Sequence, residues 1–208
     1  MVTIGFDLDG TFTDTWRPML LLMERRHGIK ASKEEIRHHE LTENEPFRRL
    51  TREQATVAFE DVWRDYRSIP LEHPRIPEMV RDFRRTYGRI LQVTSTVADR
   101  KTIHSYLDYR GITGIDSIFW CRDPKEKTRS GVDVIVDDNH VVIEAFANAG
   151  LGAVLLAQPW NEDFRNANRG NPNFAVAMNW PELPDILMGI AKGRKSNGNG
   201  DLSGLSRR

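Results

Sequence analysis

The chain opens on a short apolar run and then alternates between strand-like and helix-like patterns. Residues 2–8 form an apolar segment that ends in acidic residues and Gly10, which predicts a buried strand leading into a loop. Further strand-length apolar runs lie at 89–93, 117–121, 132–136 and 153–157. Helical patterns separate them at 77–87, 97–109 and 140–149. Apolar strands alternating with helices predict an α/β fold: a Rossmann-like parallel sheet with helices on both faces.

A further segment with helical patterns is inserted after the first predicted strand. The sequence predicts three helices within it, over 16–27, 32–41 and 51–66. Ser32 and Glu35 form a capping-box pattern at the start of the second helix. We therefore expect a small helical cap. The predicted organisation is a core of 1–14 and 76–192, a cap of 15–75, and a disordered tail of 193–208 that is rich in Gly, Ser and Asn.

Composition and charge exclude several classes of protein. Thirty basic and thirty acidic residues give the 208-residue chain no net charge, which argues against strong nucleic-acid binding or attachment to a membrane surface. The apolar stretch from Met19 to Met23 is too short to span a bilayer, and no signal-peptide pattern precedes it, so we expect a cytoplasmic protein. The single cysteine, Cys121, excludes an internal disulfide and a cysteine zinc site.

Polar side chains suited to phosphate chemistry follow the predicted strands. They are Asp7, Asp9 and Gly10 in the first group, Thr94 and Ser95 in the second, Lys127 in the third, and Asp137 and Asp138 in the fourth. Ligands of an open parallel sheet bind at the carboxyl ends of its strands, so we expect these groups to meet. Hydroxyl and ammonium groups bind an anion, but several carboxylates would repel a phosphate dianion. A neutralising cation is therefore implied, and Mg²⁺ suits a site built from oxygen ligands.

These four groups resemble the signature motifs of the haloacid dehalogenase superfamily. The segment DLDGTFTD, which begins at Asp7, resembles the first motif, and the other three groups follow in the expected order. The resemblance implies that Asp7 is a nucleophile and that Asp9 is the general acid and base. An aspartate at position 9 favours a phosphatase over the dehalogenase, phosphonatase and ion-pump branches of the superfamily.

The same resemblance implies binding roles for the remaining residues. Asp138 would ligate Mg²⁺ directly and Asp137 would support it. The full expected sets are Asp7, Asp9, Asp137 and Asp138 for the metal ion, and Gly10, Thr94, Ser95 and Lys127 for the phosphate group.

A narrower resemblance is to the 5′(3′)-deoxyribonucleotidase family, and it rests on three segments. They are the loop 122–128, the sequence Gln-Pro-Trp-Asn at 158–161, and the sequence Asn-Trp-Pro-Glu at 179–182 before the closing helix. Pro124, Lys125 and Glu126 interrupt the first segment, so Lys125 competes with Lys127 for the lysine role. The resemblance implies a 5′-nucleotidase that hydrolyses (deoxy)nucleoside monophosphates.

Other functions stay open at this point. The substrate could be another small metabolite, such as a sugar phosphate, or a nucleic-acid 3′-phosphate end. A non-catalytic binding module is also compatible with the fold, although such a module has no need of an acid at position 9. In the cap, Trp16, Phe47 and Trp63 are the expected substrate contacts, whereas three histidines among charged residues are expected on the surface without a metal role: His27, His38 and His39.

Overall fold

A single parallel sheet forms the centre of the protein. The computed structural model describes residues 1–198, with side chains as far as Lys192. The strands are β1 (Val2–Phe6), β2 (Gly88–Thr94), β3 (Ser117–Trp120), β4 (Val134–Asp137), β5 (Gly152–Leu156) and β6 (Ala175–Ala177). Their order in the sheet is β3-β2-β1-β4-β5-β6, and every neighbouring pair is parallel. The predicted α/β Rossmann-like fold is therefore confirmed, but β6 was missed because three residues are too short for a periodic pattern.

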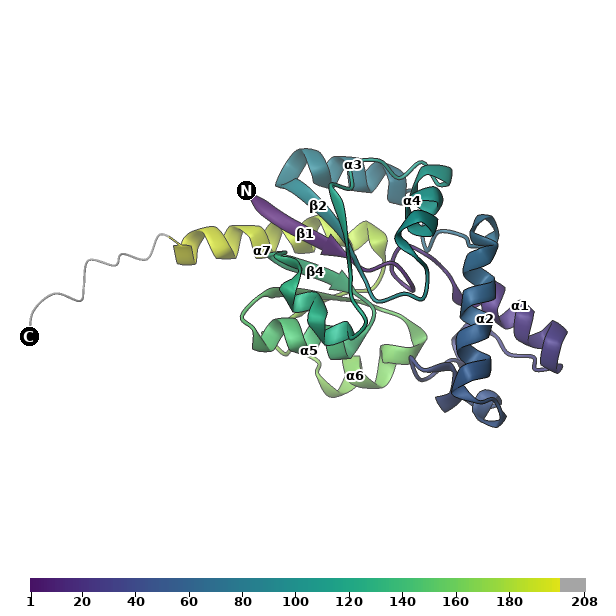
Figure 1. Ribbon diagram of the computed structural model, residues 1–208. Coiled ribbons are helices and arrows are strands. Elements are labelled where there is room, and N and C mark those ends of the chain that lie inside the picture. The colour runs from purple at the N-terminus through teal and green to yellow at the C-terminus, as the bar shows by residue number, and fades with distance from the viewer. Residues whose placement is uncertain (199–208) are drawn as a thin grey trace, which may run out of the picture.

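Helices cover both faces of this sheet (Figure 1). They are α3 (Ile76–Tyr87), α4 (Arg100–Tyr109), α5 (His140–Asn148), α6 (Glu162–Ala167) and α7 (Leu183–Gly198). Alternate strand residues point to opposite faces. Val134 and Val136 thus join the hydrophobic cluster that includes Phe83 of α3, whereas Ile135 between them joins the cluster that includes Phe146 of α5. None of the helices in residues 1–198 has the length and apolar character of a membrane span.

The closing helix, α7, overlaps the start of the tail that the sequence predicts to be disordered. α7 extends to Gly198, so it includes the first residues of the segment 193–208 that the sequence predicts to be disordered. The other residues of that segment lie outside the described part of the chain.

The inserted segment contains two α-helices, α1 (Trp16–His27) and α2 (Arg52–Arg64), which lie beyond the carboxyl ends of the strands (Figure 1). The helix predicted over 32–41 is wrong. The Ser32–Glu35 capping box forms, but it starts only one 3-10 turn, Lys33–Glu35. The buried side chain of Asn44 accepts hydrogen bonds from the backbone N–H groups of Arg37 and His38, at 2.6 and 2.8 Å. This side chain offers the backbone an alternative to helical hydrogen bonds, so the segment folds as a loop.

The chain leaves and re-enters the core at one place. Thr13, just before the predicted cap of 15–75, forms an antiparallel bridge with Leu71, near the end of that segment. Lys33 of the cap adds a polar contact at the same place, because its Nζ lies 2.7 Å from Oε1 of Glu72 and 3.2 Å from Oδ1 of Asp14. The two connections to the cap are therefore paired with each other beside the sheet.

Candidate active site

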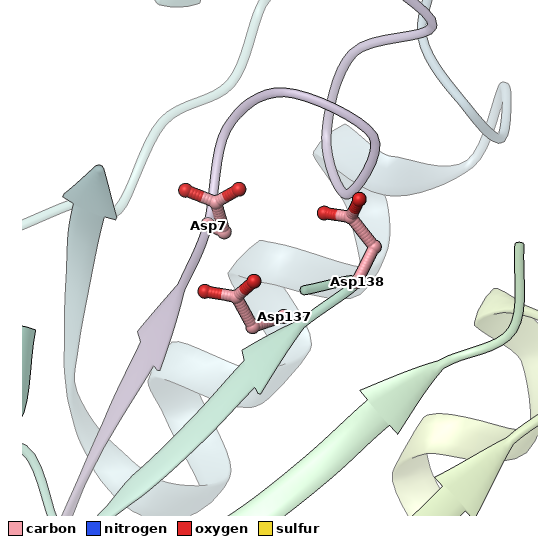
Figure 2. A group of neighbouring side chains, drawn as sticks. All are labelled: Asp7, Asp137 and Asp138. Carbon is pink, nitrogen blue, oxygen red and sulfur yellow. The ribbon is translucent and has the colours of Figure 1, made fainter. Parts of the chain in front are cut away.

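Three buried carboxylates meet where β1 and β4 end (Figure 2). Asp7 follows β1, Asp137 is the last residue of β4, and Asp138 comes directly after it. One oxygen from each side chain lies within 4.8 Å of the others. The two strands are hydrogen-bonded neighbours, so the parallel topology itself brings these residues together from distant parts of the sequence.

Lys127 lies among these carboxylates. Its side chain is 2% exposed, and its Nζ donates to Oδ1 of Asp7 at 2.7 Å and to Oδ2 of Asp137 at 2.8 Å. Burial opposes the charge on this ammonium, but the carboxylates of Asp137 and Asp7 raise its pKa above the usual lysine value. Lys125 is exposed, and the 3-10 turn Pro124–Ser130, capped by Asp123, directs Lys127 inward instead. The sequence leaves open whether Lys125 or Lys127 belongs to the site, and the structure brings Lys127 there.

Replacing Lys127 with alanine should lower the free energy of unfolding by about 3–5 kcal/mol, because Asp7 and Asp137 would lose their buried counter-charge. Urea denaturation at neutral pH without added metal measures this change. Lys125→Ala is the matched control and should stay within about 0.5 kcal/mol of the wild type, since Lys125 is on the surface. Equal losses in both variants would contradict this placement of Lys127.

Asp138 is held by neutral donors rather than by Lys127. It accepts a hydrogen bond from Trp160 Nε1 at 2.8 Å and one from Thr11 Oγ1 at 3.2 Å. Gly10 makes room for it: Gly10 has a φ of 74°, and a Cβ there would lie 2.6 Å from Oδ2 of Asp138. Gly10, expected from the sequence to help bind phosphate, thus allows the acidic side chain of Asp138 to approach the loop.

Full ionisation of these three carboxyl groups beside one ammonium would leave two uncompensated negative charges, which burial opposes. Burial and the neighbouring carboxylates raise the pKa of both Asp137 and Asp138. A divalent cation would balance these charges, and a set of carboxylate oxygens is the kind of donor that Mg²⁺ prefers. The residues present therefore fit Mg²⁺. Lys127 binds both Asp7 and Asp137, whereas Asp138 is bound by neutral donors, so Asp138 is the carboxylate of the three that has no ammonium beside its oxygens.

Asp9 is not part of this group of three carboxylates. It is half-buried, and its Oδ1 accepts a hydrogen bond from Nε1 of Trp63 at 3.2 Å. The expected place of Asp9 among the metal ligands therefore stays a prediction. Burial raises the pKa of Asp9 to about 6, against the lowering effect of hydrogen bonds from Thr96, Trp63 and Thr15. A carboxyl group with this pKa can give and recover a proton near neutral pH.

The core and the cap enclose a cavity of about 320 Å³ above these residues. Its core side includes carboxylates, hydroxyls and one ammonium that were expected from the sequence: Asp7, Asp9, Thr94, Ser95, Lys127 and Asp138. Thr94 is 1% exposed, and its Oγ1 accepts a hydrogen bond from the backbone N–H of Thr96 at 3.1 Å. The predicted phosphate-binding hydroxyls thus reach the cavity that also contains the acids.

The cap residues expected to contact substrate have three different placements. Trp16 lines the cavity and packs against Trp160, with 5.4 Å between ring centroids. Phe47 is fully buried and is not part of the cavity wall, so a substrate contact by Phe47 is wrong for this structure. Trp63 does not line the cavity either, because its ring is 2% exposed and its N–H is directed at Asp9. Phe59, another aromatic residue of α2, lines the wall.

Two basic side chains of the cap also line the cavity, and sequence reasoning missed both. His39 is exposed, as expected, but its Nε2 lies 4.0 Å from Oδ2 of Asp138. The guanidinium of Arg52 has no hydrogen bond or ion pair with the side chain or backbone of any other described residue, and only the carbonyl oxygen of Arg52 accepts a hydrogen bond, from Thr56. No sequence signal could locate them. The position of His39 depends on the loop that Asn44 orders, and the capping box of Thr51 and Gln54 marks the start of the helix at Arg52 but not the direction of the Arg52 side chain.

No protein-family model matches the chain, and no curated protein matches it. Similar folds occur among solved structures. Mycobacterium tuberculosis Protein Tyrosine Kinase A is 18% identical, with a TM-score of 0.66 over 89% of this chain and 97% of that one. A predicted phosphoglycolate phosphatase from Haemophilus somnus is 17% identical, with a TM-score of 0.60 over 90% and 98%.

A third structure is that of YfnB from Bacillus subtilis, described as a HAD-hydrolase bound to magnesium. It is 15% identical, with a TM-score of 0.57 over 90% of this chain and 98% of that one. At these identities the likeness concerns the fold. The chain thus has the fold of haloacid dehalogenase-like phosphatases.

Proposed function

We propose that this protein is a Mg²⁺-dependent phosphomonoester hydrolase that works through an aspartyl-phosphate intermediate. The observation that carries the proposal is the meeting of Asp7, Lys127 and Asp138 at the floor of one cavity, with Asp9 beside them. This arrangement supplies a nucleophile, a cation for the transferring group, and a separate acid. A phosphoryl group needs these components because its transfer depends on positioning and on charge stabilisation.

Two carboxyl groups carry out the proposed reaction, with Asp7 as the nucleophile and Asp9 as the acid and base. An oxygen of Asp7 attacks phosphorus, the bond from phosphorus to the leaving oxygen breaks, and protonated Asp9 gives its proton to that oxygen. Asp9 then takes a proton from a water molecule, which attacks the aspartyl-phosphate and releases inorganic phosphate and free Asp7. Two moderate steps replace one of the slowest uncatalysed reactions.

The charged groups around Asp7 serve the phosphoryl oxygens in both steps. Lys127, fixed by Asp7 and Asp137, would donate its third N–H to a phosphoryl oxygen, and Thr94 would offer a hydroxyl from the neighbouring strand end. Asp7 and Asp138 would hold Mg²⁺, with Asp137 behind them. When bound, the ion would neutralise charge on the carboxylates and the phosphoryl oxygens, so that the two anions can approach each other.

A nucleoside monophosphate is the substrate class we propose. The aromatic side chains of Trp16 and Phe59 in the cavity wall suit a planar base, and base–aromatic stacking contributes about 1–3 kcal/mol per base in other nucleic-acid sites. Two of the segments that resemble the 5′(3′)-deoxyribonucleotidase family, 158–161 and 179–182, also contribute hydrogen bonds to the loops that carry the acidic residues. Trp160 donates to Asp138, and Trp180 donates from its Nε1 to the carbonyl oxygen of Thr11 at 2.9 Å.

A second candidate substrate is a small metabolite phosphate that carries another negative charge. The unpaired guanidinium of Arg52 and the imidazole of His39 face the same cavity and favour such an anion. The similar structure described as a phosphoglycolate phosphatase is named for a substrate of this kind. The two candidates differ in what the leaving group must offer the cap: a flat ring or a second charge.

Release of inorganic phosphate from a substrate panel tests both proposals. With Mg²⁺, we expect kcat/KM for a nucleoside monophosphate to be at least about tenfold above that for a sugar phosphate, which corresponds to ~1.4 kcal/mol of transition-state binding. EDTA should abolish release. Equal or faster hydrolysis of sugar phosphates, phosphoglycolate or a 3′-phosphorylated oligonucleotide would overturn the nucleotide assignment. No release from any member of the panel would overturn the phosphatase itself.

The variant Trp16→Ala, measured in the same assay, tests whether the preference for nucleotides comes from the cap. Loss of the stacking surface should reduce the tenfold preference for nucleotides toward equality. An unchanged preference would show that the base lies elsewhere in the cavity.

A further inference from the structure

A hydrogen bond joins the cap to the acid of the core. Trp63 lies on α2 of the cap, whereas Asp9 lies in the loop after β1, and Nε1 of Trp63 donates to Oδ1 of Asp9 at 3.2 Å. Asp9 faces the cavity that contains Asp7, but the Trp63 ring does not line it. The indole therefore contacts the acid from outside the cavity wall.

The core holds the Trp63 ring firmly in this position. The ring is 2% exposed and packs edge-on against Tyr106 of α4, with 5.5 Å between centroids and 76° between planes. Tyr106 is itself fully buried. An indole N–H is only a donor, so it suits a carboxylate acceptor and cannot exchange a proton with it during the reaction.

We propose that Trp63 is one of the residues that position Asp9 for proton transfer, and the one that reaches it from α2 of the cap. Its N–H occupies Oδ1 and fixes the rotation of the carboxyl group, which leaves Oδ2 to carry the proton to the leaving oxygen. As the bond from phosphorus to that oxygen breaks, the proton moves from Oδ2 and Trp63 keeps its own. This inference rests on the proposed function and deepens it, because it makes acid catalysis dependent on docking of the cap against the core.

The leaving group of the substrate can separate this role from a structural one. An alkyl phosphate expels a basic alkoxide and needs a proton from a well-placed acid, whereas p-nitrophenyl phosphate expels a stable anion and needs little help. A fault in the position of Asp9 must therefore slow the alkyl ester more than the aryl ester. A loss of folded protein must slow both equally.

The experiment compares kcat/KM and KM of Trp63→Phe on a nucleoside monophosphate and on p-nitrophenyl phosphate, both with Mg²⁺. The parameter kcat/KM reports the step that expels the leaving group and not the hydrolysis of the aspartyl-phosphate, which is common to both esters. Phenylalanine keeps an aromatic ring against Tyr106 but removes the donor. We expect kcat/KM for the nucleotide to fall about tenfold or more, a part of the ~10²–10⁴-fold that a positioned acid provides, with KM nearly unchanged. For the aryl ester, kcat/KM should fall less than about threefold.

Two further variants calibrate the ratio of the alkyl rate to the aryl rate. Trp180→Phe removes another buried indole N–H, one that binds the backbone of Thr11 rather than Asp9, so its ratio should stay within about twofold of the wild type. Asp9→Asn should shift the ratio in the same direction as Trp63→Phe and further. The ratio does not depend on the amount of folded enzyme, so partial unfolding of a variant does not obscure the result.

An unchanged ratio in Trp63→Phe, with both rates lowered together or not at all, would overturn the positioning role while the phosphatase stands. A rise in KM alone would also overturn it, because Trp63 would then act in substrate binding. A wild-type protein that hydrolyses neither ester would remove the proposed function, and this inference with it.

Discussion

Asp7→Asn should yield a folded protein that releases no measurable phosphate from any ester. A carboxamide is not a nucleophile toward phosphorus and carries no charge for Mg²⁺. The fold should persist, because the amide oxygen still accepts from Lys127 and the ammonium keeps its ion pair with Asp137. Phosphate release measures activity, and the far-UV circular dichroism spectrum with the urea midpoint measures the fold.

Asp163→Asn is the matched control for this substitution. The chemical change is identical, but Asp163 is an exposed residue of α6, so turnover should equal that of the wild type. Wild-type rates in Asp7→Asn would remove Asp7 from the mechanism. An unfolded Asp7→Asn protein would instead contradict the placement of its oxygen as a neutral acceptor for Lys127.

The second large effect should come from Asp9→Asn, which should lower kcat for an alkyl phosphate by about 10²–10⁴-fold, the contribution of a positioned acid and base. With p-nitrophenyl phosphate, the first step needs little acid, yet the second still lacks its base. The aspartyl-phosphate should therefore accumulate on Asp7. Mass spectrometry of the acid-quenched protein should show the gain of one phosphoryl group.

A comparison with Asp7→Asn separates the two steps. The Asp7→Asn variant cannot form the covalent bond. A protein that carries both Asp7→Asn and Asp9→Asn should therefore show no mass gain. Full activity in Asp9→Asn would place the acid and base elsewhere, and slow turnover without any accumulation would show that Asp9 serves only the first step.

The core of the site could be predicted because its residues occupy strand ends. Asp7 and Asp137 are 130 residues apart in the sequence. Asp7 follows one apolar strand and Asp137 ends another, and parallel strands present their carboxyl ends at one edge of the sheet. The parallel topology therefore predicts, without any measured distance, that residues at these strand ends lie close together. Lys127 was harder, because only the 3-10 turn around it decides which of two nearby lysines faces inward.

The cap could be predicted as helical but not in its contacts. Helical spacing places Trp63 on the apolar face of a predicted helix, and Phe47 lies between two predicted helices. Neither observation shows whether a ring faces substrate, core or a polar acceptor. The loop around His39 depends on one buried side chain, Asn44, which binds the backbone in place of a helix. Contacts of this kind depend on tertiary structure and leave no periodic mark in the sequence.

The pairing of Thr13 with Leu71 makes the ends of the whole insertion neighbours. For the core, the cap is thus equivalent to one surface loop, and each doubling of loop length costs only about 0.6 kcal/mol in closure entropy. Segments of very different length can be exchanged at this point without disturbing the strands that carry the carboxylates. New specificity could therefore arise by replacing a whole cap, through recombination or by design, while the hydrolytic chemistry is inherited intact.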